Sequence, residues 1–136
     1  MRLATALLLA FTLAMVAVHL TSTRLLRRAW SARAPAWLSV PNIFRFEGIY
    51  YLALMAYVAW QRSRFLLAPL VIMAALHLAG WAAAERKHGW LVNTSGEAAQ
   101  ARILTGVQIF DLGETVVLVY VAYVLARGIL GYWVGA

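Results

Sequence analysis

The sequence predicts an all-α integral membrane protein, a four-transmembrane-helix bundle with a short interfacial segment after the first helix. Two observations lead to this fold class. Of the 136 residues, 64% are hydrophobic, and the mean hydropathy is +0.76, whereas soluble domains are about 45–50% apolar. In addition, four apolar segments approach the length of about 20 residues that crosses the hydrocarbon core of a bilayer. A chain of this length forms one domain, which we expect over residues 1–136.

The four expected spans follow one another along the chain. They cover about residues 3–20, 43–60, 65–84 and 103–126. Arg2 precedes the first span as in a secretory signal, but no small-x-small cleavage site follows, so we expect this span to be retained. The second span must include Arg45 and Glu47 to be long enough. Pro69 is tolerable in the third span because it falls near the helix start.

Two segments outside the spans are expected at the membrane interface. Residues 21–42 connect the first two spans, where Pro35 and Pro41 prevent one long helix and Trp30 and Trp37 suit the headgroup region. The final segment, residues 127–136, is too short for a fifth crossing. We expect it to anchor the fourth span.

Lys and Arg residues near the spans predict the orientation. Eight lie on the side of loops one and three and four on the other side, so the positive-inside rule places loops one and three in the cytoplasm and both termini outside. The eight are Arg24, Arg27, Arg28, Arg33, Arg45, Arg86, Lys87 and Arg102. We expect the bacterial inner (plasma) membrane. Since the net charge of +7 is explained by topology signals and lipid contacts, we expect no nucleic-acid partner.

Two carboxylates in the fourth span are the main candidates for a functional site. Asp111 and Glu114 lie near its middle, where a charged group costs about 2.5–3.5 kcal/mol on insertion scales. Gln108 and Thr115 share their helix face and extend the polar stripe. An intramembrane acid is a functional candidate by default.

Depth along the spans predicts which residues meet. Counted at about 1.5 Å per residue, His77 on the third span lies nearly as deep as Asp111, and we expect the two side chains to meet. The third span also has small residues that let membrane helices approach closely: Ala75, Ala79, Gly80, Ala83 and Ala84. The same count puts His19 near the cytoplasmic interface and leaves Glu114 without a cationic residue at its depth.

The polar residues divide into two candidate roles. If the protein is an enzyme, which the sequence leaves open, proton transfer falls to Asp111, Glu114 and His77. The candidate ligand-binding residues are Gln108, Thr115, Trp81, Glu47, Arg45, Arg24, Arg27 and Arg28. Arginines after the first span would attract an anionic headgroup, and Trp81 would stack on a ring-shaped ligand.

Three functions fit this pattern. The first is an accessory or structural subunit of a membrane complex, with a buried acid/His cluster on its cytoplasmic half and with other membrane subunits or a second copy as partners beside the lipid bilayer. The second is a lipid- or quinone-binding protein, or an enzyme acting on an amphipathic substrate at the cytoplasmic leaflet, with bound lipid or quinone as the cofactor. The third is proton or cation translocation along the acids.

The sequence predicts no metal site. Cys is absent, which excludes thiolate ligands and thiol redox chemistry. Glu85 and His88 have the spacing of a di-iron helix, but the required second copy is missing. His19 and His77 differ in expected depth by about 8 Å, which is unsuitable for two axial ligands of one haem.

Overall fold

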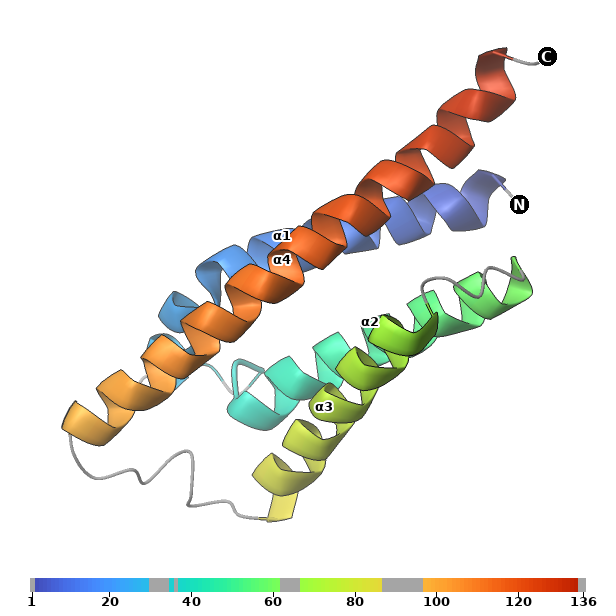
Figure 1. The fold of residues 1–136 in the computed structure, drawn as a ribbon. Coiled ribbons are helices and arrows are strands. Elements are labelled where there is room, and N and C mark those ends of the chain that lie inside the picture. The colour runs from blue at the N-terminus through green and yellow to red at the C-terminus, as the bar shows by residue number, and fades with distance from the viewer. Residues whose placement is uncertain (1, 30–34, 36, 62–66, 87–96, 135–136) are drawn as a thin grey trace. The chain divides into compact units, whose positions relative to one another are not determined.

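The computed structural model describes residues 2–29, 35, 37–61, 67–86 and 97–134. These residues form four helices, α1 (Arg2–Ala29), α2 (Val40–Trp60), α3 (Leu67–Arg86) and α4 (Glu97–Val134), which confirms the all-helical class (Figure 1). The chain divides into two compact units. Unit 1 comprises Met1–Leu25 and Ala101–Ala136, and unit 2 comprises Leu26–Gln100. The expected packing of all four helices into one bundle stays a prediction.

Three helices of the described chain are long and apolar enough to cross a membrane. The candidate spans are Leu3–Ala29, Ala68–Arg86 and Ala98–Gly128. Helix α2 has 21 residues, but it is not among these candidates, because Arg45, Glu47 and several tyrosines lower its hydropathy. A fourth span therefore stays a prediction.

Helix α1 is longer than the sequence predicts. It continues beyond the expected end at residue 20 as far as Ala29, so Arg24, Arg27 and Arg28 lie on its last turns instead of on an interfacial segment. Cations near a helix C-terminus are favoured by the helix dipole. Much of the rest of the expected interfacial segment, including Trp30, lies outside the described residues. Helix α4 likewise continues beyond its predicted end at residue 126.

Unit 1 contains most of α1 and most of α4. The buried residues of both helices recur at intervals of seven residues. The buried residues of α1 alternate at spacings of three and four, as in a coiled coil. They are Thr5, Leu8, Thr12, Met15, His19 and Ser22. Helix α4 buries Leu104, Asp111, Leu118 and Leu125 at spacings of seven, with Glu114 and Val121 beside them. The two helices run antiparallel (Figure 1), and His19 of α1 contacts Glu114 of α4.

Unit 2 contains the helical hairpin of α2 and α3, which pack against each other. Ser39 caps α2 by accepting a hydrogen bond from the Asn42 N–H, and Pro41 sits in the first turn. Gly80 of α3 faces α2 so closely that an added Cβ would lie 2.7 Å from the Phe44 ring. The small size of Gly80 therefore sets how closely the helices approach.

The alanine stripe on α3 does not form the contact within unit 2. Ala75, Ala79 and Ala83 are exposed, whereas Ala74 and Ala84 are buried with His77. The expected packing of the third span on the fourth would join the two units, and it stays a prediction.

Candidate functional site

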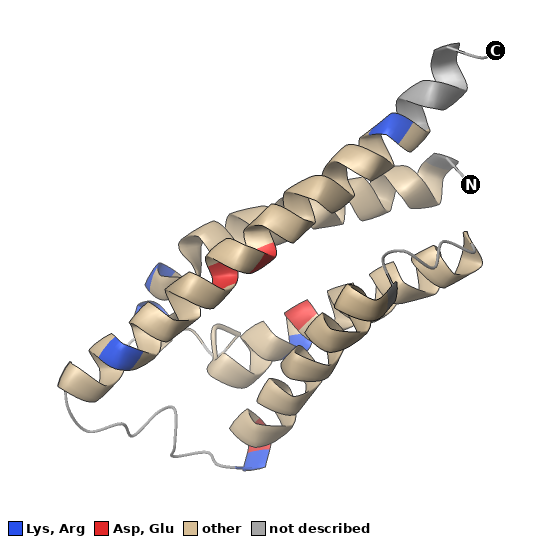
Figure 2. Cartoon of the chain, in the orientation of Figure 1, with Lys and Arg blue, Asp and Glu red and all other residues tan. Residues whose placement is uncertain are grey.

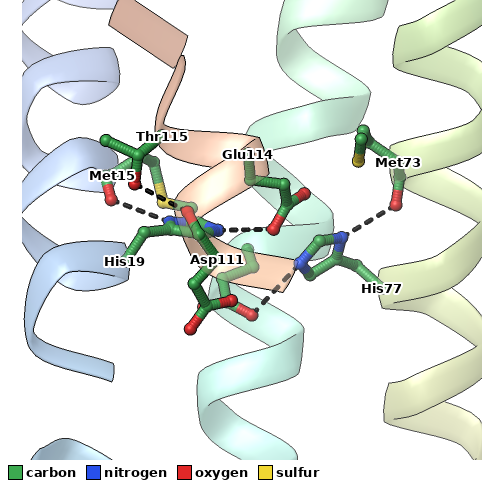
Figure 3. Close-up of polar contacts among 8 residues, drawn as sticks. Met15, His19, Met73, His77, Asp111, Glu114 and Thr115 are labelled. Atoms are coloured by element: carbon green, nitrogen blue, oxygen red, sulfur yellow. Dashed lines mark hydrogen bonds and ion pairs between the residues drawn. The ribbon is translucent and has the colours of Figure 1, made fainter. Parts of the chain in front are cut away.

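A buried imidazole–carboxylate pair joins the two helices of unit 1. His19 Nε2 lies 2.7 Å from Glu114 Oε2, and the two side chains are 1% and 0% exposed. The other ring nitrogen, Nδ1, lies 2.8 Å from the Met15 carbonyl oxygen one turn earlier on α1 (Figure 3). Both ring nitrogens are thus held, and the ring orientation is fixed.

The two contacts determine how many protons the pair carries. A backbone carbonyl can only accept, so we assign a proton to His19 Nδ1. The 2.7 Å contact at Nε2 requires one further proton between nitrogen and oxygen. That proton belongs either to an imidazolium facing a carboxylate or to a carboxylic acid facing a neutral ring. In both cases the pair is neutral overall and shares one proton, which lowers the cost of burying it.

A second pair of the same kind lies in unit 2. His77 Nε2 lies 3.4 Å from Glu47 Oε2, with side-chain exposures of 4% and 8%. His77 Nδ1 lies 2.8 Å from the Met73 carbonyl oxygen (Figure 3). The ring is also flanked by aromatic residues of α2, with its centroid 4.8 Å from that of Tyr51 and 6.2 Å from that of Phe44.

The two histidine segments are alike in sequence and in geometry. Residues 15–20 and 73–78 both read Met-x-Ala-x-His-Leu. In each, the imidazole Nδ1 donates to the carbonyl of the methionine one turn earlier, and Nε2 faces a glutamate from the neighbouring helix. The chain therefore presents the same imidazole–carboxylate arrangement once in each unit.

The depth estimate from sequence was wrong for His19 and Glu114. Because α1 continues to Ala29, His19 lies well inside the helix, where it contacts Glu114. Glu114 therefore has an imidazole beside it in its own unit. The expected meeting of His77 with Asp111 would join the two units, so it stays a prediction.

The other predicted residues of the polar stripe on α4 differ in burial. Asp111 and Thr115 are buried, and the Thr115 hydroxyl donates to the Asp111 backbone carbonyl at 2.7 Å. Gln108 is exposed, so the buried part of the stripe begins at Asp111. Thr115 thereby satisfies its hydroxyl within its own helix.

Two predicted ligand-binding residues form a small surface cluster in unit 2. Arg45 Nη2 lies 2.8 Å from Glu85 Oε1, and the Trp81 indole N–H donates to the same oxygen at 3.1 Å. The Arg45 guanidinium lies 5.1 Å from the Trp81 ring centroid. The charged side chains are 46% and 43% exposed, so this ion pair contributes about 0–1 kcal/mol to stability.

The predicted arginines of the first loop lie on α1. Arg24, Arg27 and Arg28 are exposed on its last turns. Figure 2 shows basic residues toward both ends of α4 and acidic residues near its middle; in unit 1 these are Arg102, Arg127, Asp111 and Glu114. The arginines remain candidates for contact with an anionic headgroup.

Sequence reasoning missed His19 as a site residue, together with Thr5, Thr12 and Ser22. A signal was present, because Thr5, Thr12 and His19 follow one another at spacings of seven, as do Leu8, Met15 and Ser22. Such a repeat marks a helix face that packs against another helix. Mean hydropathy does not reveal this repeat, because most residues of the first span are apolar.

The geometry of these pairs is the basis for a functional assignment. In comparisons with known proteins, no family model, no curated protein and no solved structure matches this chain.

Proposed function

We propose that this protein is a small membrane protein that translocates protons and that the His19–Glu114 pair is its proton-binding site. The observation that carries the proposal is the 2.7 Å contact between His19 Nε2 and Glu114 Oε2, with both side chains almost fully buried. Such a pair holds one exchangeable proton in an apolar environment. Intramembrane chains of Glu, Asp and His are the usual proton relays of pumps and transporters.

A purely structural role explains the pair less well. Replacing a buried ion pair with apolar residues of similar volume is often neutral or stabilising. An apolar helix contact would hold α1 and α4 together without the cost of inserting Glu114 and His19. The presence of a second, similarly anchored pair in unit 2 also favours a function for the arrangement.

The other two functions have less support from the contacts. Glu47, Glu85 and Glu114 each contact a residue of their own unit, so a partner subunit is not needed to stabilise them. Trp81, the candidate for stacking on a quinone ring, lies against Arg45. We therefore place proton translocation ahead of the accessory-subunit and lipid- or quinone-binding functions.

Proton flux into proteoliposomes tests the proposal. The purified protein is reconstituted with a pH-sensitive dye inside the vesicles, and a potassium diffusion potential drives proton entry. Wild-type protein is expected to acidify the lumen. Glu114→Gln is expected to reduce the flux to that of empty vesicles, because the amide can still donate to His19 Nε2 but carries no acidic proton.

Glu85→Gln is the matched control, since it removes a carboxylate that is exposed and paired with Arg45. Its flux is expected to equal that of wild type. A wild-type flux no greater than that of empty vesicles, from protein that is helical and membrane-inserted, would rule out proton translocation. Full flux through Glu114→Gln would exclude Glu114 as the proton-binding group.

A further inference from the structure

The histidines and glutamates that form the two buried pairs alternate along the chain. His19 lies on α1, Glu47 on α2, His77 on α3 and Glu114 on α4. The half of the chain that forms α1 and α2 and the half that forms α3 and α4 therefore each have a histidine on the first helix and a glutamate on the second. The Met-x-Ala-x-His-Leu segment recurs around each histidine, and Ala-Tyr-Val follows each glutamate at residues 56–58 and 122–124. This order is the pattern of two tandem copies of one two-helix module.

Each histidine contacts the glutamate of the other half of the chain. His19 contacts Glu114, and His77 contacts Glu47. Both pairs are thus formed where a helix of one half meets a helix of the other. Many membrane transporters are built from two structural repeats and bind their substrate or coupling ion at the contact between the repeats. In unit 2, the second pair therefore has the position in the repeat that the proposed proton-binding site has in unit 1.

The His77–Glu47 pair can hold one proton, as the first pair does. His77 Nδ1 donates its proton to the Met73 carbonyl, so Nε2 faces Glu47 Oε2, at 3.4 Å. A proton on Nε2 makes the ring an imidazolium beside a carboxylate, and the pair is then neutral overall and costs less to bury. The distance is longer than the roughly 2.7–3.2 Å of an N–H···O hydrogen bond. Opposite charge, rather than a short hydrogen bond, therefore holds the two groups together.

The surroundings of the second pair limit the access of water to it. The side chains of His77 and Glu47 are 4% and 8% exposed. Tyr51, which is itself buried, packs against the imidazole with the ring centroids 4.8 Å apart. Glu47 is the carboxylate at the ring, whereas Glu85 lies about 12 Å further along α3 and is paired with Arg45 at the surface. The proton of this pair is therefore held in an apolar environment, as it is in unit 1.

We propose that the His77–Glu47 pair is a second proton-binding site and that proton translocation requires both pairs. On release, the Nε2–H bond of His77 breaks, its electron pair stays on the nitrogen and the proton leaves. On uptake the same bond forms again, and no electron is transferred. The assignment rests on the proposed function, because a second site has this role only if protons pass through the protein. It extends that function by giving the protein two sites, one in each unit.

Proton flux into proteoliposomes, driven by a potassium diffusion potential, tests the proposal. Glu47→Gln and His77→Gln are each expected to lower the flux by about tenfold or more, because an amide cannot bind and release a proton at either position. Glu47→Asp keeps a carboxyl group in the pair and is expected to retain measurable flux. Glu85→Gln is the matched control, because its carboxylate is exposed, and its flux is expected to equal that of wild type. Circular dichroism checks that every variant remains helical.

A double variant distinguishes proton binding from a purely structural role of the pair. His77→Leu combined with Glu47→Leu removes both polar groups and leaves neither uncompensated, so the contact between α2 and α3 is expected to remain stable. A structural role predicts full flux through this variant, whereas proton binding predicts a flux about tenfold or more below that of wild type.

The outcomes separate this proposal from the proposed function. Full flux through Glu47→Gln, or through the double variant, would overturn the second site, and the first site would stand if Glu114→Gln still abolishes flux. A wild-type flux no greater than that of empty vesicles would overturn both.

Discussion

His19 makes one hydrogen bond to its own helix and shares a second proton with Glu114 on α4. Removing only the imidazole leaves the Glu114 carboxyl group buried without that contact. We expect His19→Leu to lower the free energy of unfolding by about 3–5 kcal/mol, whereas His19→Leu combined with Glu114→Leu restores most of the loss because no polar group is left uncompensated. Equilibrium unfolding in mixed micelles, followed by circular dichroism, measures both variants. A double variant as unstable as the single one would show that the pair does not act as a unit.

The exposed ion pair of unit 2 provides a contrast with the buried His19–Glu114 pair. Arg45 and Glu85 are also in direct contact, but both side chains are nearly half exposed. We expect Glu85→Gln to change the free energy of unfolding by less than about 1 kcal/mol, in part because the amide oxygen can still accept from the Trp81 indole. The same unfolding assay measures it, and a loss as large as that of His19→Leu would contradict our view that burial decides the difference.

At the level of helices, the contact between α2 and α3 depends on Gly80. An added methyl group there would collide with the Phe44 ring, at 2.7 Å, and Phe44 also flanks His77. We expect Gly80→Ala to destabilise the hairpin by about 1–3 kcal/mol, the usual cost of overpacking. Gly113→Ala is the matched control, since nothing lies within 4 Å of its added Cβ, and it is expected to be neutral or to stabilise α4 by up to about 1 kcal/mol.

The existence of the four helices and the end of α2 at Trp60 were predictable, but the ends of α1 and α4 and the partners of Glu47 and Glu114 were not. Hydropathy finds α1, α3 and α4 because each contains a long window of mostly apolar residues. It stops too early on α1, where Arg24, Arg27 and Arg28 are polar yet continue the helix. The partner of each acid depends on which helices pair, and local periodicity does not contain that information. Asp111 and Glu114 were therefore identified as buried acids, while the contacts of Glu114 with His19 and of Glu47 with His77 were not foreseen.

For the whole molecule, the distribution of Lys and Arg predicts that loops one and three are cytoplasmic. Because the chain has no Cys, single thiols report this directly. A thiol at Ser95, a position outside the described residues, is expected to react with a membrane-impermeant maleimide only in inside-out vesicles. A thiol at Gln61, the exposed C-cap of α2, is expected to react only in right-side-out vesicles. The opposite pattern would reverse the orientation.

Unit 1 combines α1 with α4, which are far apart in the sequence. This separation determines the order in which the contacts of the two units can form during synthesis. The α2–α3 hairpin is continuous in sequence, so the ribosome completes it early, and Glu47 can meet His77 while the rest of the chain is still being synthesised. His19 cannot contact Glu114 until α4 has been synthesised, because Glu114 is 95 residues further along the chain. During that interval the imidazole of His19 is not yet joined to Glu114. Synthesis of α4 is therefore the step that completes unit 1, whereas the contact between α2 and α3 can form earlier.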